Sequence, residues 1–157
     1  MLVVWNIYAW KEIMEYTVRV DMDGTTEWYK ENKLHREDGP AIECTNGYKE
    51  WYKEGKLHRE DGPAIEHSDG GKYWYKEGEL HREDGPAIEH ITGYKVWYRE
   101  GLHHREDGPA IEYSDGSKKW YLNEEELSEE EFNKRMNGLV CDRIVEIDGV
   151  KYRLVVI

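Results

Sequence analysis

The sequence contains no long hydrophobic run, and its apolar stretches fall far short of the roughly 20 residues that a membrane-spanning helix needs. The opening residues, MLVVWNIYAWKE, are apolar, but they have neither a basic segment nor a small-residue cleavage site. They therefore do not have the pattern of a signal peptide. These absences predict a cytoplasmic protein without a membrane span.

Cysteine is scarce as well. Only Cys44 and Cys141 are present, far apart and without the spacing of metal ligands. Disulfide scaffolds and cysteine-based zinc sites use denser cysteine patterns. The sequence also lacks a Ser/His/Asp or Cys/His nucleophile set and a phosphate-binding loop. We expect two reduced thiols, no metal, no other cofactor and no enzymatic activity.

A basic stripe is absent too. The net charge is −12, and its strongest acidic excess lies in NEEELSEEEF near the C-terminus. Elsewhere acidic and basic residues alternate. This pattern argues against nucleic acid as a partner, because such proteins present clustered Lys and Arg. The alternation also argues against a DNA mimic, which we keep only as a minor alternative, because a mimic presents a uniform acidic track.

Aromatic residues are abundant, although there is only one Phe. They make up 13% of the chain, with 7 Trp and 12 Tyr, so the protein folds, because disordered chains are poor in aromatics. The 157 residues suffice for one modest core. An apolar content of only 38% suits an elongated molecule better than a sphere.

One decapeptide, LHREDGPAIE, occurs at Leu34, Leu57 and Leu80 and returns as HHREDGPAIE at His103. The spacing of 23 residues is shared by a series of tryptophans and a series of prolines: Trp28, Trp51, Trp74, Trp97 and Trp120, and Pro40, Pro63, Pro86 and Pro109. Four units fill residues 28–119 without insertion or deletion. Such regularity is the signature of a repeat architecture.

Each unit reads as two short strands. In the second unit, residues 48–53 and residues 64–67 have strand composition, and the KEGK segment is a turn with Gly55 at positive φ. Asn32 takes the glycine position in the first unit. EDGP forms a sharp bend, since Pro63 cannot donate a ladder hydrogen bond. No unit has a helical apolar period.

These features resemble the MORN repeat family, whose 23-residue units form successive β-hairpins. The matching pieces here are WYKEGKLH with SDG, over roughly residues 18–121. The sequence departs from the family pattern where HREDGP replaces its HGxG core, and its first turn is one residue longer. The variant resembles repeat proteins of phages and giant viruses and some bacterial antitoxins. The resemblance implies a protein- or lipid-binding scaffold, such as an antitoxin or a viral inhibitor of a host defence factor in the host cytoplasm.

The predicted fold is mainly β, an elongated antiparallel meander of tandem 23-residue hairpins. Residues 1–27 form an N-terminal cap of strands, residues 28–119 the repeats and residues 120–157 a C-terminal cap. In that cap SEEEFNKRM reads as a short helix, in which Ser128 and Glu131 form a capping box and Lys134 and Arg135 occupy the last turn. A hairpin with an Asp148–Gly149 turn follows.

The charged motif has two interpretations. Its arginines could form a row of anion-binding sites: Arg36, Arg59, Arg82 and Arg105. Alternatively, each arginine pairs with carboxylates of its own or the next unit, which the local charge balance favours. The histidines of the repeat cannot share one metal ion, because units about 10 Å apart exceed ligand distances near 2 Å.

Residues that differ between units are where specificity would be encoded. One such column is Cys44, His67, His90 and Tyr113, and another is Glu50, Tyr73, Val96 and Lys119. We expect the tryptophans to pack with Ile42, Ile65, Ile88 and Ile111, leaving a tyrosine row on the other face: Tyr29, Tyr52, Tyr75 and Tyr98.

The tyrosine row, with His67, His90 and Tyr113, is the candidate contact surface for a protein partner. The sequence thus favours a non-catalytic binding module. The alternative is a protein that sequesters a small ligand, such as a nucleotide held between the tyrosine and arginine rows. The sequence leaves the oligomeric state open.

Overall fold

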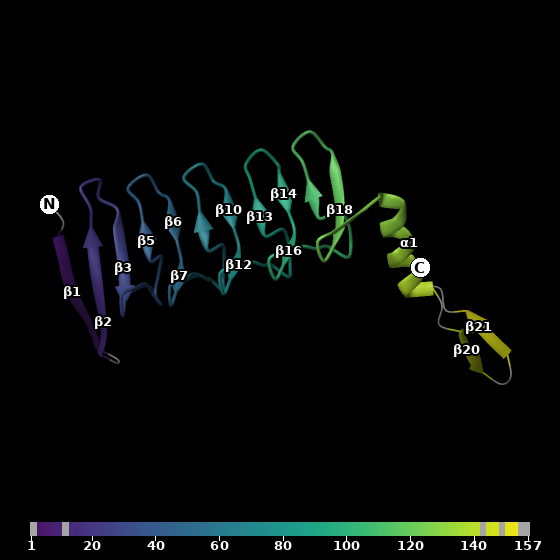
Figure 1. Cartoon of the computed structure of the whole chain (residues 1–157), viewed down its shortest axis with the longest axis horizontal. Helices are drawn as coiled ribbons and strands as arrows, with labels where there is room; N and C mark the ends of the chain where they lie inside the picture. Colours follow the sequence, from purple (N-terminus) through teal and green to yellow (C-terminus); the bar gives the residue numbers. More distant parts are fainter. Residues whose placement is uncertain (1–2, 11–12, 142–143, 148–149, 154–157) are drawn as a thin grey trace.

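The computed structural model describes the chain except for residues 1–2, 11–12, 142–143, 148–149 and 154–157. It is mainly β: an elongated antiparallel meander with one short helix near the C-terminal end (Figure 1). The predicted fold class is confirmed. The principal sheet has 13 strands, and its strands follow one another in chain order.

The two N-terminal strands are the longest, β1 (Val3–Trp10) and β2 (Ile13–Val20), and most strands of the repeat region have two residues. The first unit begins with β3 (Thr26–Lys30) and β4 (Lys33–Leu34). The sheet strands of the repeats are β5 (Ile42–Glu43), β6 (Lys49–Glu50), β9 (Ile65–Glu66), β10 (Lys72–Tyr73), β13 (Ile88–Glu89), β14 (Lys95–Val96), β17 (Ile111–Glu112) and β18 (Lys118–Leu122).

Small hairpins off the main sheet complete the units along one border of the array (Figure 1). They are β7 (Tyr52–Lys53) with β8 (Lys56–Leu57), β11 (Tyr75–Lys76) with β12 (Glu79–Leu80), and β15 (Tyr98–Arg99) with β16 (Leu102–His103). The remaining elements are β19 (Glu125–Leu127), helix α1 (Glu129–Cys141), β20 (Ile144–Ile147) and β21 (Val150–Arg153).

The tips of these hairpins have the backbone predicted for them. Gly55 has φ +82°, and in the first unit Asn32 has φ +61°. The preceding residues, Glu54 and Glu31, also have positive φ, at 53° and 50°. Two consecutive left-handed residues define a type I′ turn, whose twist matches that of a two-stranded hairpin.

Backbone hydrogen bonds join each unit to the next outside the sheet ladder. The Arg59 N–H donates to the Tyr75 carbonyl at 3.2 Å, and the Gly78 N–H donates to the Leu57 carbonyl at 2.9 Å. Equivalent bonds recur along the array. Stacking between neighbours therefore supplies stability, as in other linear repeat proteins.

The strand register corrects one expectation about the two faces. Ile42 pairs with both Glu27 and Glu50, so the three residues lie on one face of the sheet. Trp28 alternates with Glu27 along β3 and therefore lies on the opposite face. The prediction that tryptophans and isoleucines share a face is wrong. We call the two sides the Ile–Tyr face and the Trp–Arg face.

The Trp–Arg face is covered by the chain itself. The HREDGP bends fold back over it, and the alanine that follows each bend is completely buried: Ala41, Ala64, Ala87 and Ala110. The tryptophans beneath the bends are half-buried. The Ile–Tyr face carries no second layer among the described residues.

The C-terminal cap closes the last unit. Leu127 and Phe132 are buried. The predicted capping box is present, since Ser128 N–H donates to the Glu131 carboxylate at 3.0 Å and Glu131 N–H donates to Ser128 Oγ at 3.2 Å. The helix continues to Cys141, so Arg135 is not in its last turn and instead pairs with Glu125 at 2.6 Å. The Asp148–Gly149 turn lies outside the described residues.

Candidate binding surface

The arginine of the repeated motif is held on every side within its own unit. The Arg59 guanidinium carbon lies 4.0 Å from the centre of the Trp51 ring. Its Nε donates to Asp61 at 2.9 Å, and Nη1 donates to the Pro63 carbonyl at 3.2 Å and to Glu66 at 3.0 Å. This combines a cation–π contact with charge-assisted hydrogen bonds.

The structure explains why glycine occupies the fifth position of the HREDGP motif, which the sequence did not reveal. A Cβ added at Gly62 would lie 3.0 Å from the Arg59 guanidinium carbon, a contact tighter than most real Cβ contacts, so the guanidinium would have to shift by a few tenths of an ångström. The guanidinium is therefore sandwiched between the Trp51 ring and the Gly62 backbone. The other units repeat the stacking at 4.1, 4.0 and 3.9 Å.

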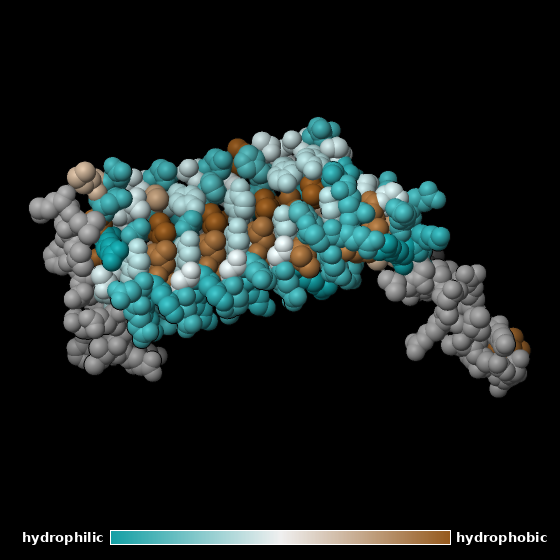
Figure 2. All heavy atoms as spheres, viewed as in Figure 1, coloured by the Kyte–Doolittle hydropathy of each residue, from teal (hydrophilic) through white to brown (hydrophobic). Residues whose placement is uncertain are grey.

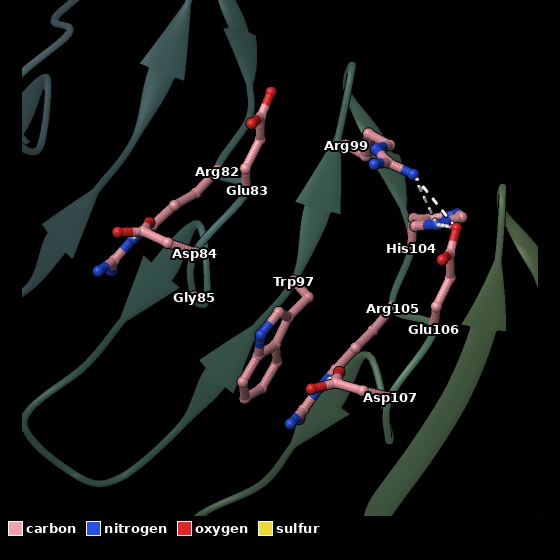
Figure 3. A pocket seen from close by; sticks show the side chains of 10 residues that line it. All are labelled: Arg82, Glu83, Asp84, Gly85, Trp97, Arg99, His104, Arg105, Glu106 and Asp107. Carbon is pink, nitrogen blue, oxygen red and sulfur yellow. Dashed lines mark hydrogen bonds and ion pairs between the residues drawn. The ribbon is translucent and has the colours of Figure 1, made fainter. Parts of the chain in front are cut away.

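Each motif arginine pairs with an acid of its own unit, as the structural interpretation of the motif predicted. Beside the guanidinium groups of Arg59 and Arg82, the pKa values of Asp61 and Asp84 lie below their ordinary range. Figure 3 shows two successive bends, with the Trp97 ring between them. Anion binding at these arginines stays a prediction.

Each motif histidine accepts a hydrogen bond from the backbone of the next unit. His35 Nδ1 accepts a hydrogen bond from the backbone N–H of Glu54 at 3.1 Å, and His81 Nδ1 does the same for Glu100 at 3.2 Å. His35 is 5% exposed. A buried side chain that bonds the neighbouring backbone is a structural element, and sequence reasoning gave it no such role.

Shallow hollows separate successive bends. Three of them measure about 590, 750 and 880 Å³, and each is lined by two motif arginines with their Glu-Asp pairs. In the hollow of Figure 3, Arg99 and His104 both approach Glu106, at 3.3 and 3.1 Å. The motif arginines that line these hollows are paired with the aspartates beside them.

The opposite, Ile–Tyr face is built around one row of side chains. Cross-strand pairing aligns them in the order Glu27, Ile42, Glu50, Ile65, Tyr73, Ile88, Val96, Ile111 and Lys119. We call this the midline row. Figure 2 shows the result as hydrophobic stripes that alternate with paler ones, above a hydrophilic border.

Aromatic rings flank the midline row on both sides. His67 packs between Tyr48 and Tyr73, with ring centres 5.0 and 5.2 Å apart. Tyr94 and Tyr113 lie 5.6 Å apart.

On the side of the small hairpins, His103 lies 4.3 Å from Tyr98 and 5.0 Å from Tyr121. The first three units have leucine at the position that His103 occupies in the fourth unit. The rings on both sides of the midline row form a network of edge and tilted contacts.

The tyrosine hydroxyls of this face stay protonated at neutral pH. Burial, with Glu50 nearby, raises the pKa of Tyr52 to about 12. Burial also raises the pKa values of Tyr75 and Tyr98. The Tyr98 hydroxyl lies 2.8 Å from His103 Nε2, and the Tyr52 hydroxyl bonds Glu50, so both hydroxyl oxygens remain as acceptors for a partner's donors.

The predicted contact residues are brought together only in part. Tyr52, Tyr75 and Tyr98 are half-buried, and they pair with Leu57, Leu80 and His103 in the small hairpins. His67 and Tyr113 are exposed in the aromatic clusters of the same face.

Two of the predicted contacts lie apart from the centre. Tyr29 lies at the N-terminal end, where its hydroxyl donates to Glu27 at 2.9 Å. His90 sits at a turn, with Nδ1 2.9 Å from Thr92 Oγ1.

Sequence reasoning missed Tyr48, Tyr94 and His103 as members of this surface. Their signal was present, because each occupies a column whose residue changes between units: Tyr48, Gly71, Tyr94 and Ser117, and Leu34, Leu57, Leu80 and His103. Adding the two columns noted above, four variable columns map to the Ile–Tyr face or to the turns at its edge. The stacked Trp, Arg and Gly residues of the Trp–Arg face do not vary.

Comparison with family models, curated proteins and solved structures finds no match to this chain. The resemblance to MORN repeats therefore rests on the residues quoted above. No helix among the described residues is long and apolar enough to cross a bilayer.

Proposed function

We propose that this protein is a non-catalytic binding module that docks a protein partner on its Ile–Tyr face. The observation that carries the proposal is the separation of the two faces. The midline row and its flanking rings on the uncovered face change from unit to unit, whereas the stacked Trp, Arg and Gly residues of the covered face are the same in every unit. On the side of the hairpins away from the tyrosines, the position that changes most is the column Lys33, Lys56, Glu79 and Leu102. A repeat scaffold that varies on one face varies where contacts are specified.

The chemistry of the face suits a protein surface. Tyrosine offers a large, rigid ring with a hydrogen-bonding group, and such residues dominate binding energy at interfaces. The half-buried Ile42, Ile65 and Ile88 of the midline row add apolar area. The face belongs to a hydrogen-bonded sheet, so little ordering is needed when a partner binds.

A small ligand fits the arrangement less well. The tyrosine rings and the arginine guanidinium groups project from opposite faces of the sheet, so no nucleotide can lie between the two rows. The arginines in the hollows between the bends are already paired with aspartates. Small molecules are usually held in concave apolar pockets with a few convergent polar groups.

The resemblance adds two classes of partner, a host defence factor and a toxin. Both would dock on the same face, because the opposite face is already occupied by the bends of the chain itself. A viral inhibitor and an antitoxin differ in the partner and not in the mode of binding.

Site-specific photo-crosslinking in cells tests the proposal. A benzophenone amino acid is introduced in place of Tyr75 on the Ile–Tyr face and, as control, in place of exposed Lys72 on the Trp–Arg face. We expect discrete protein adducts from position 75 that disappear when Ile88→Arg places a charge at the half-buried centre of the midline row. Equal adducts from both positions, or none from position 75, would contradict the proposal.

A further inference from the structure

The central part of the midline row is self-complementary. From β6 to β18 it reads Glu50, Ile65, Tyr73, Ile88, Val96, Ile111 and Lys119. Ile88 on β13 is its midpoint. Around this point isoleucine mirrors isoleucine, an apolar valine mirrors an aromatic ring, and an acidic residue mirrors a basic one.

A two-fold axis would match these positions. Rotation about an axis parallel to β13 and above Ile88 turns the face over and reverses the order of the row. Glu50 of one copy then opposes Lys119 of the other. Tyr73 opposes the position of Val96, whose side chain is only 1% exposed within its own chain, so the half-buried residues of the row make the contacts. Interfaces with this symmetry require such self-complementarity, and two-fold dimers are the most common oligomers.

We propose that the partner on the Ile–Tyr face is a second copy of this chain, packed face to face around Ile88. The inference rests on the proposed function of that face. Two sheets would lie about 10 Å apart with their strands roughly aligned, as in a β-sandwich. A sheet with one apolar face is stable when that face is buried against another layer, and the second copy supplies the layer.

The size of the row sets the strength of the dimer. Seven strands span about 29 Å, and the five residues from Tyr48 to Tyr52 add about 16 Å in the other direction. A face of that size buries on the order of 1,000 Å² over two copies, near the lower end for specific interfaces. The dimer should therefore be reversible and concentration-dependent.

The charges at the ends of the row retain partners in their own chain. Lys119 Nζ lies 3.0 Å from Glu126, and the Glu50 carboxylate accepts a hydrogen bond from the Tyr48 hydroxyl. Both residues are half-buried. Contacts across the dimer would thus orient the second copy more than they would add affinity.

The Trp–Arg face does not offer the same fit. Its outer edge carries a Glu-Asp pair in each bend, and in the second unit the side chains of Glu60 and Asp61 are 82% and 84% exposed. Two such edges facing each other would oppose like charges, which is unfavourable. The Ile–Tyr face is therefore the side available to a second copy.

Sedimentation equilibrium of the full chain over a wide concentration range tests the dimer. The unaltered protein should show a reversible monomer–dimer equilibrium. Glu50→Lys alone should weaken it at least tenfold, since each dimer would then contain two Lys–Lys contacts, and Lys119→Glu alone should act likewise. The double variant, Glu50→Lys with Lys119→Glu, should restore the unaltered dissociation constant because the pairs are exchanged.

Lys118→Glu is the matched control. Lys118 precedes Lys119 in β18 but pairs with Glu112 on the other face, so this variant should dimerise like the unaltered chain. The inference is overturned if the chain is a monomer at all concentrations. It is also overturned if neither single substitution changes the dissociation constant of the dimer. If the chain is a monomer and position 75 still crosslinks to a different protein, the dimer fails and the proposed function stands.

Discussion

The ring Nδ1 of His81 accepts a hydrogen bond from the backbone N–H of Glu100, 3.2 Å away in the next unit. Only a lone pair can accept this bond, so the proton of the neutral ring sits on Nε2, which is 3.6 Å from Glu83. Glu100 has φ +51° and opens the type I′ turn of its unit. One largely enclosed ring, with a side chain 13% exposed, thus ties the bend of one unit to the turn of the next.

Replacing this ring should loosen the connection between two units. His81→Ala leaves the Glu100 N–H without its acceptor, and we expect a loss of about 1–3 kcal/mol of unfolding free energy. His81→Asn should lose less, because its Oδ1 can take the place of Nδ1. Chemical denaturation measures the difference, and faster amide exchange at Glu100 locates it. Unchanged exchange at Glu100 in His81→Ala would disprove the role.

The stacked guanidinium predicts that lysine cannot replace arginine. Arg59→Lys keeps the positive charge but loses the planar stacking on Trp51 and the fixed hydrogen bonds to Asp61 and Pro63. We expect a loss of about 1–2 kcal/mol in unfolding free energy, measured by urea denaturation. As a control, Lys53→Arg on the exposed hairpin should be neutral. Equal stability of Arg59→Lys and the unaltered protein would show that charge alone matters.

The loss of stability caused by replacing Gly62 should depend on whether Arg59 is present. Gly62→Ala places a Cβ against the guanidinium carbon and should destabilise the protein by about 1–3 kcal/mol. In an Arg59→Ala background the same change should cost much less, since the clash is gone. A double-mutant cycle reports the coupling. Additive effects would mean that the bend requires glycine for another reason.

Acid should destabilise the bends. The Arg59 guanidinium holds the pKa of Asp61 below its ordinary range, and Arg82 does the same for Asp84. A carboxyl group with a lowered pKa in the folded state stabilises the fold above its unfolded pKa of about 3.9, and this contribution is lost as pH falls through the folded value. Melting temperature should therefore decrease below about pH 4.

The variant Asp61→Asn with Asp84→Asn isolates this contribution to the pH dependence. It should be less stable than the unaltered protein at pH 7, and the gap should narrow as the pH falls below about 4. Both carboxylates are exposed, so the effect should be modest and should shrink in high salt. A gap that stays constant with pH would refute the linkage.

Local features of the chain were predictable from the sequence because they depend on neighbouring residues. The 23-residue period implied hairpins in series, and Gly55 and Asn32 marked the positions of positive φ. Ser128 and Glu131 correctly predicted the start of the helix. The end of that helix was placed too early, because helix termini depend on contacts beyond the capping residues.

Which residues share a face of the sheet could be assigned only from the tertiary structure. Alternation along a strand places Trp51 and Tyr52 on opposite sides, but it does not say which of them accompanies Ile65. That choice depends on register: Ile65 pairs with Glu50, which alternates with Trp51, and a shift of one residue would have reversed every assignment. The turns between strands fix this register in space. The sequence by itself thus determined a meander of hairpins, and only the pairing of its strands decided which side is covered and which is free to bind.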